Sequence, residues 1–593
     1  MKNKTSSTLT RAKASHAPVA KGLIPLKANK THCWIGLLGL VMPLAYADDA
    51  PIISNDPTRA QQPAQVQQMM PAKPGNGFQL PQVSRPSVLN GIGKTLVIKS
   101  VQFAGNSAIP TQELEALAQP YLNRPLTAAD FETLRRKISL FYVEKGYVNS
   151  GAVINNQSLA SGLLKLTIIE GKLTEVKQNG QGRLPESYLR DRLILGSGDP
   201  LNVNKLQDSY RLLLGNPLIE RLNGRLLPGK NLGEATLDVT VTRARPYQMY
   251  AGTDNYQTPS VGEVTGRMGG WVDNLLKMGE HIDGQVSING GSTGYNTGIA
   301  VPVSAHDTRV SFRYSSTYSN IIEAPLNVLN INSNIIGYDA GIAHPVYRTF
   351  KDELTLGLNF VVRQNRTTLA NNCISTTPGI NDCNTQATVL RMSQHYSHRG
   401  DSNNGVFWST FNAGLNALGA TTNPGQQSGQ FFSWLGQSMF SQKVLDNGAA
   451  VVLKANIQLS DSPLLNQERY SVGGAYTVRG YRENTYVRDN GFNASLEFKY
   501  PLLTAAMADK GSLFLVPFMD YGGAWNNPTS ITSKMPTDYL HSVGVGFNWK
   551  YQKLSTDFYW AHAIASVNNP QKNTLPHDIQ DDGIHFRVNM NAF

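Results

Sequence analysis

Phe492-Asn493-Ala494-Ser495-Leu496-Glu497-Phe498-Lys499-Tyr500 is the stretch that decides the fold, because every second residue in it is apolar. Successive side chains of a β-strand point to opposite faces, so this stretch has one apolar face and one polar face. Residues 449–459 and 543–549 show the same alternation. A strand between lipid and a watery lumen needs this pattern over about 9–11 residues. The stretch therefore predicts a strand of a membrane β-barrel.

The alternating pattern continues to the end of the chain and predicts a sixteen-stranded outer-membrane β-barrel over residues 245–593. An even number of strands returns the chain to its starting side, and the connections alternate between short and long, which is typical of periplasmic turns and outer loops. A soluble all-β array is the alternative. The expected strands start near 246, 263, 279, 294, 307, 333, 352, 386, 404, 431, 448, 491, 511, 539, 552 and 582.

The composition argues against a helical membrane protein and against a nucleic-acid partner. Only 16% of the 593 residues are charged, against about 25% in ordinary soluble proteins. No apolar run reaches the roughly 18 residues of a spanning helix. The formal net charge is +11, but seven bases lie within 1–47, and without them 46 bases face 42 acids. We therefore expect no nucleic-acid partner.

Residues 1–47 have the features of a secretory signal peptide. A basic segment without acids precedes an apolar stretch from Cys33 to Leu44, and Ala45-Tyr46-Ala47 supplies a cleavage site. The apolar stretch is too short for the alternative, a membrane anchor. Residues 48–94 are rich in Pro and Gln and are predicted to form a linker, either an inert spacer or a plug with a short helix.

Residues 95–172 and 173–244 are predicted to form two small α+β modules. Both follow the order strand, helix, helix, strand, strand, which makes them an internal repeat. A three-stranded sheet with helices on one face leaves a strand edge free, and such an edge can bind an extended peptide by strand addition. A pair of rigid spacers is the alternative.

Cys373 and Cys383 are the cysteines that remain after removal of the signal peptide. A turn-rich segment without His separates them. Because export places them in an oxidising compartment, we expect a disulfide that closes one small outer loop, and no metal site.

Two motifs are candidates for function. The longest outer loop, 461–490, contains Val478-Arg479-Gly480-Tyr481, and Phe518-Met519-Asp520-Tyr521-Gly522 follows downstream. Asp520 shares strand parity with Phe518, and a carboxylate that faced lipid would be costly, so Asp520 is expected to face the lumen.

Together these features resemble the outer-membrane transporters of two-partner secretion, of the haemolysin and filamentous-haemagglutinin transporter type. The resemblance covers the linker, two polypeptide-transport-associated (POTRA) domains, the barrel and the loop 461–490. It implies that the loop folds back into the barrel and that Arg479 pairs with Asp520. An arginine fork fits a carboxylate at two points, and such a contact contributes about 1.5–3 kcal/mol. A solvated Arg479, or a pair that stabilises the barrel without moving, are the alternatives.

The resemblance also implies a function. An unfolded partner exoprotein of the β-helical haemolysin or adhesin type would bind the POTRA domains in the periplasm and be secreted through the lumen, and activation of the partner can accompany secretion. Other expected partners are outer-membrane lipid and the barrel-assembly machinery. No cofactor is expected, since no Gly-x-x-x-x-Gly-Lys-Ser/Thr sequence indicates ATP use. An insertase that assembles other outer-membrane β-barrels is the alternative, and a passive porin would not need residues 95–244.

Two further features concern catalysis and insertion. Gly290-Gly291-Ser292-Thr293-Gly294 matches the Gly-x-Ser-x-Gly pattern of hydrolases, but it is expected at a strand-to-strand turn, where a nucleophile elbow does not form, so no enzyme is expected. Phe593 is the expected C-terminal insertion signal. It falls off the apolar parity of 584–590, which predicts a bulge near Asn591.

Overall fold

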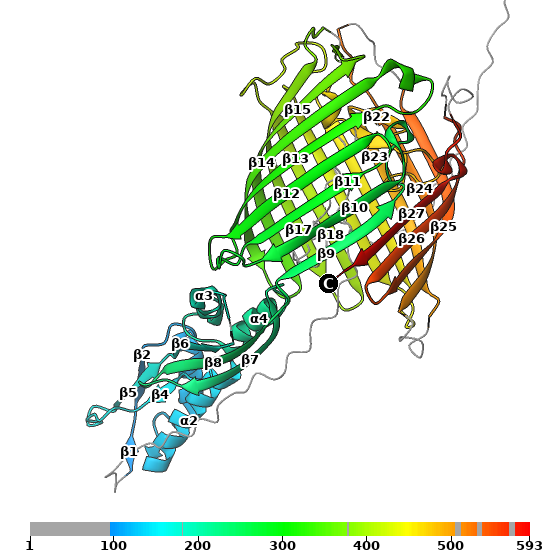
Figure 1. Ribbon diagram of the computed structural model, residues 1–593. Helices are drawn as coiled ribbons and strands as arrows, with labels where there is room; N and C mark the ends of the chain where they lie inside the picture. The colour runs from blue at the N-terminus through cyan, green and yellow to red at the C-terminus, as the bar shows by residue number, and fades with distance from the viewer. Residues whose placement is uncertain are drawn as a thin grey trace, which may run out of the picture. The chain divides into compact units, whose positions relative to one another are not determined.

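Figure 1 shows the computed structural model, which describes residues 95–592 except 181, 376, 378, 504–510, 531–535 and 568–575. The predicted signal peptide 1–47, the linker 48–94 and Phe593 lie outside the described residues. In the described part of the chain, no helix combines the length and the apolar character that a membrane crossing requires.

The first module is a three-stranded sheet with two helices, and its strand order is β2-β5-β4. β2 runs parallel to β5, and β4 runs antiparallel to it. Helix α2 begins with a capping box, because Thr127 and Asp130 each accept a backbone N–H of the other. The elements are β1 (Leu96–Val97), β2 (Ser100–Ala104), α1 (Thr111–Ala118), η1 (Gln119–Tyr121), β3 (Pro125–Leu126), α2 (Ala128–Glu144), β4 (Gly151–Val153) and β5 (Leu163–Ile169).

The second module repeats this topology with the strand order β6-β8-β7, and its first and last strands again pair in parallel. Helix α4 is capped by Asn202, whose side chain accepts the N–H groups of Asn204 and Lys205. Buried Leu and Val side chains of the helices and the sheet form one core. The elements are β6 (Lys172–Asn179), α3 (Glu186–Ser197), α4 (Val203–Leu214), β7 (Ile219–Pro228) and β8 (Glu234–Arg243).

The rest of the described chain is a closed antiparallel barrel, in which β27 pairs with β9 (Figure 1). Sixteen long strands form the wall within the described residues, and the two-residue strand β16 (Asn372–Cys373) is added beside β15, which confirms the predicted barrel. The long strands are β9 (Tyr247–Asp254), β10 (Thr265–Asp273), β11 (His281–Ile288), β12 (Ser292–Pro302), β13 (Arg309–Asn320), β14 (Ile331–Arg348), β15 (Asp352–Leu369), β17 (Asn384–Arg399), β18 (Asn403–Gly414), β19 (Phe432–Lys443), β20 (Ala450–Ser460), β23 (Asn490–Pro501), β24 (Ser512–Trp525), β25 (Asp538–Tyr551), β26 (Leu554–Ala563) and β27 (Ile584–Asn591).

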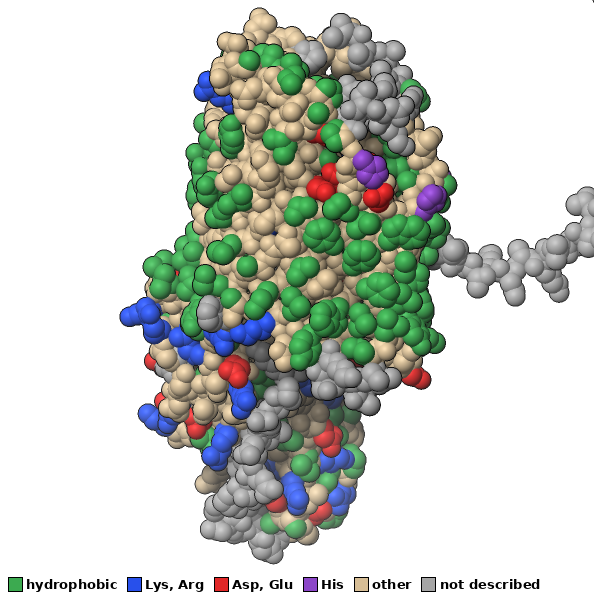
Figure 2. Space-filling view, turned by 45° about the vertical axis from the view of Figure 1, so that its right-hand side comes forward, with side chains coloured by type: hydrophobic (Ala, Val, Ile, Leu, Met, Phe, Trp, Pro, Cys, Tyr) green, Lys and Arg blue, Asp and Glu red, His purple; other side chains and the backbone are tan. Residues whose placement is uncertain are grey.

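The two faces of the barrel wall differ as the alternation predicts. Leu496 is 44% exposed, whereas Glu497 beside it is 0% exposed. Met519 and Asp520 on β24 show the same contrast, at 56% and 3%. Figure 2 shows the apolar side chains as a broad belt over the barrel strands. The outward apolar face suits lipid, and polar side chains are gathered inside.

The predicted bulge near Asn591 is wrong within the described residues. The pairing of β27 with β26 and with β9 continues without a register shift, and Asn591 lies opposite Tyr250. The apolar residues 584–590 keep one parity along the whole strand, so nothing in the described part requires an inserted residue.

Candidate functional site

The loop between β20 and β23 enters the barrel and carries structure of its own. It contains the short helix η4 (Asn466–Glu468) and a hairpin formed by β21 (Tyr470–Val472) and β22 (Tyr486–Arg488). Val472 and Val478 are fully buried and pack with Ala524 of β24 and Leu540 of β25. The loop is therefore an ordered element packed on the barrel wall.

Arg479 at the tip of this loop binds Asp520 of β24. Its Nε donates to Oδ2 of Asp520 at 2.8 Å, and one terminal nitrogen donates to Oδ1 at 2.8 Å. The backbone N–H of Arg479 donates to the same carboxylate at 3.0 Å. The two residues are 4% and 3% exposed. This two-point contact is the geometry in which a guanidinium binds a carboxylate most strongly.

The guanidinium of Arg479 has a second acidic partner on β23. Its Nη1 lies 2.9 Å from Oε1 of Glu497, and Nη2, the nitrogen that donates to Asp520, also donates to the hydroxyl of Ser495 at 2.9 Å. Glu497 in turn accepts a hydrogen bond from Lys454 of β20 at 2.7 Å. Arg479 at the tip of the loop thus binds two adjacent strands, β23 and β24, directly, and Lys454 of β20 joins the same connected set of charges through Glu497.

Two aromatic rings enclose the Arg479 guanidinium. Its central carbon lies 3.4 Å from the ring centroid of Phe518 and 4.8 Å from that of Tyr559. A cation over an aromatic face gains about 2 kcal/mol or more when water is excluded. Phe518 therefore contributes a binding face for Arg479, next to the Asp520 carboxylate on the same strand.

The glycines of both motifs permit this close packing. Gly480 has φ +91, and a Cβ atom there would lie 3.1 Å from Ala561. At Gly522 a Cβ atom would lie 2.8 Å from Val472 and 2.9 Å from Val478. Tyr481 also holds the loop in place. Its hydroxyl lies 2.9 Å from the carbonyl oxygen of His541 and 3.0 Å from that of Ala565, and it can donate to either one.

Arg482 extends the contacts of the loop to two other outer loops. It binds Asp581 before β27 at 2.5 Å and Glu323 after β13 at 2.6 Å. Burial alone would raise the pKa of the Asp581 carboxyl, but the hydrogen bonds and the charge of Arg482, together with a hydrogen bond from the Asp578 backbone, outweigh burial and lower it. These pairs lie between outer loops and are more exposed than the Arg479 cluster.

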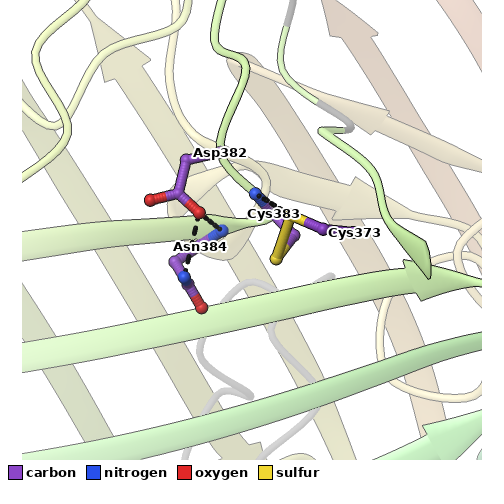
Figure 3. Close-up of a disulfide and its surroundings, with 4 residues drawn as sticks. All are labelled: Cys373, Asp382, Cys383 and Asn384. Carbon is purple, nitrogen blue, oxygen red and sulfur yellow. Dashed lines mark hydrogen bonds between the residues drawn. A yellow bond between two sulfur atoms is a disulfide. The ribbon is translucent and has the colours of Figure 1, made fainter. Parts of the chain in front are cut away.

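The two cysteines are joined by a disulfide at the end of β15 (Figure 3). Their Cα atoms are 5.0 Å apart, and the backbone N–H of Cys383 donates to the sulfur of Cys373. Asp382 beside them accepts two hydrogen bonds from Asn384 at 2.9 Å. Among the described residues, Cys373, Asp382 and Cys383 place three possible metal-ligand atoms within 4.8 Å of one another. Because the sulfurs are bonded to each other, they do not offer the thiolates that a metal needs.

Ser292 has none of the surroundings of a nucleophile. It begins β12 in a strand-to-strand hairpin, and its hydroxyl lies 3.0 Å from that of Ser319. A nucleophile elbow requires a strand-to-helix turn and a base within hydrogen-bonding reach. The Gly-x-Ser-x-Gly match is therefore a feature of the turn.

Sequence reasoning paired Arg479 with Asp520 but missed Ser495 and Glu497. A signal was present, because both residues lie on the polar face of the 492–500 stretch, which the alternation turns toward the lumen. The register between β23 and β24, which puts Ser495 directly opposite Asp520, cannot be deduced from the sequence pattern. The part played by Phe518 as a cation-binding face was missed as well.

Comparisons with known proteins agree with these features. Residues 233–549 match the family described as haemolysin secretion/activation protein ShlB/FhaC/HecB, and residues 96–171 match the ShlB-type POTRA domain. The outer membrane transporter CdiB of Escherichia coli is 23% identical over 448 residues, 73% of each chain. The hemolysin transporter protein ShlB of Serratia marcescens is 25% identical over 484 residues, 76% of this chain and 80% of that one. The solved structure of CdiB from Escherichia coli has a similar fold, with a TM-score of 0.65 and 19% identity over 86% of this chain and 93% of that one.

Proposed function

Because the chain belongs to the haemolysin secretion/activation family, whose members are outer-membrane transporters, we propose that it secretes a partner exoprotein through its barrel. The observation that carries the proposal is the Arg479 cluster, which holds an ordered loop inside a closed barrel. Removing one member of a buried ion pair is costly, whereas such pairs add little net stability. The cluster is therefore suited to fixing the position of the loop, and displacement of the loop opens the path for the partner.

The partner enters as an unfolded chain and is first bound by the POTRA domains. In the first module the sheet edges within the described residues are β2, with five residues, and β4, with three. The longer edge, β2, is the better template for an added strand. Folding of a β-helical partner outside the cell draws transport outward without ATP, and activation of the partner accompanies its passage.

Outer-membrane lipid surrounds the apolar belt, and the barrel-assembly machinery inserts the chain. The family match favours secretion over the insertase that the sequence left as an alternative.

Secretion of the partner by cells that make Arg479→Ala tests the proposal. Arg488→Ala is the matched control, because Arg488 lies on the same loop but pairs with Asp538 at 2.9 Å in a half-exposed position. We expect Arg479→Ala to assemble, as judged by the heat-dependent shift of a folded barrel on a gel, and to secrete far less partner. Normal secretion from assembled Arg479→Ala would contradict the proposal.

Capture by β2 is tested with a photoreactive residue at Gln102, which is exposed on this strand. The control position is Lys137, which is exposed on helix α2 of the same module. We expect the partner to crosslink to position 102 and not to 137. Equal crosslinking at both positions would exclude specific binding to this edge.

A further inference from the structure

Glu468, at the other end of the inserted loop, binds a different part of the barrel wall. Its carboxylate accepts two hydrogen bonds from one terminal nitrogen of Arg391 of β17, each at 2.8 Å. Arg363 of β15 lies 3.7 Å from the same carboxylate. The Glu468 side chain is 5% exposed and that of Arg391 is 9% exposed. This is a buried ion cluster separate from the one around Arg479.

The backbone around Glu468 is held as well. Gln458 of β20 donates to the carbonyl oxygen of Glu468 at 2.9 Å and to that of Asp489 at 3.1 Å. Arg391 also donates to Asn412 of β18 at 3.0 Å, which fixes the guanidinium on the wall. The short helix η4, which ends at Glu468, is therefore attached to the wall by side-chain and backbone contacts.

The two clusters hold the loop to different arcs of the barrel. Glu468 binds β15 and β17, whereas Arg479 binds β23 and β24, and in the barrel order β18, β19 and β20 lie between. Loss of the Arg479 contacts therefore leaves the loop bound at Glu468. Because Arg391 and Arg363 are both positive, losing the Glu468 carboxylate would leave the buried Arg391 and the half-buried Arg363 without the anion that they share.

We propose that the Glu468–Arg391 pair is a second anchor, about which the loop pivots when the Arg479 cluster opens. The tip of the loop then swings while η4 stays on the wall. This movement clears part of the lumen. The loop stays inside the barrel, so it can close the lumen again after transport. This role has meaning only if the loop moves during transport, so it rests on the proposed function. Glu468 acts by positioning the loop, not by contacting the partner.

Single-channel currents of the full chain in planar lipid bilayers test the second anchor without the partner. We expect Glu468→Gln alone to keep the low conductance of the wild type, because the Arg479 cluster still holds the tip. Arg479→Ala should give intermediate steps, because the pivoting loop still occupies part of the lumen. The double variant Glu468→Gln/Arg479→Ala should give steps at least twofold larger than Arg479→Ala.

The control must separate loss of the anchor from loss of a lumenal charge. Arg391→Gln combined with Arg479→Ala removes the anchor from the wall side and should also give the larger steps. Arg313→Gln combined with Arg479→Ala removes a different arginine, which binds Asp283 and Asn296 on the wall itself, and should behave as Arg479→Ala alone. Having both anchor variants also guards against one of them failing to fold.

The proposal is overturned if both anchor double variants, assembled as judged by heat-dependent mobility, conduct as Arg479→Ala does. It is also overturned if Arg313→Gln enlarges the steps as much as they do. Secretion can fail or succeed independently of these currents, so the two proposals are tested separately.

Discussion

Gly522 of β24 lies so close to Val478 of the inserted loop that a Cβ atom on Gly522 would be 2.9 Å from the valine methyl group. The two sequence motifs thus meet at a steric contact as well as at the ion pair between Arg479 and Asp520. Two adjacent contacts of different kinds make the docked position of the loop specific.

Gly522→Ala should displace the loop while every charged partner of Arg479 remains. The added methyl would be 2.8 Å from Val472 and 2.9 Å from Val478, so one of the elements must move. We expect increased uptake of a bulky antibiotic such as vancomycin by cells that make this variant. Gly284→Ala is the control, because its nearest heavy atom would be 3.8 Å away. Equal uptake by the two variants would count against a steric role.

Asp520→Ala should weaken loop docking less than Arg479→Ala. In Asp520→Ala, Arg479 keeps its contacts with Glu497 and Ser495. In Arg479→Ala, the buried carboxylates of Asp520 and Glu497 both lose their arginine partner. Removing one member of a buried pair costs about 3–5 kcal/mol, and the remaining acceptors should reduce that cost for Asp520→Ala. Digestion of the loop by external chymotrypsin, whose tyrosine sites are the same in both variants, measures docking. Faster digestion of Asp520→Ala than of Arg479→Ala would refute the shared role of Glu497.

The disulfide should stabilise its own loop and leave transport unchanged. It closes a segment with a sequence separation of 10, so its loss costs about 2–3 kcal/mol in the chain-entropy account. Cys373→Ser/Cys383→Ser should be cleaved faster by external protease between β15 and β17 and should secrete normally. A secretion defect in an assembled double variant would give the disulfide a further role.

Glu170 should make the first POTRA domain sensitive to acid. Burial raises the pKa of its carboxyl, but hydrogen bonds from the Ser107 hydroxyl and from the backbone amides of Ala108 and Ser107 outweigh burial and lower it. A lowered pKa stabilises the fold above the unfolded value of about 4.3, and this contribution is lost as pH falls through the lower folded value. Hydrogen exchange at Ser107 and Ala108 should quicken below about pH 4, relative to distant amides.

Glu170→Gln is the matched variant for this pH dependence. It keeps the shape of the side chain but cannot ionise, so its exchange at Ser107 and Ala108 should be faster at neutral pH and less dependent on acid. A wild-type response in Glu170→Gln would assign the acid sensitivity to another group.

Much of the barrel was predictable because lipid and water enforce a period of two along each strand. The strand expected near 491 begins at Asn490, and that expected near 386 begins at Asn384. The hairpin within the loop 461–490 was not foreseen, because three-residue strands are too short to show alternation. The pairing of Asp520 with Arg479 followed from the two motifs. The contacts of Glu468 depend on the path of the loop across the lumen, and this path cannot be predicted from a local sequence pattern.

The Cys373–Cys383 link also constrains how the barrel is made. Thiols are oxidised in the periplasm, yet the linked segment lies after β15, in a loop expected at the opposite end of the barrel from the short periplasmic turns. If the disulfide forms before insertion, the closed loop must cross the bilayer as two chain segments side by side. A reduced loop could cross as a single extended chain. Biogenesis of this chain would then be sensitive to the timing of oxidation even where the finished transporter is not.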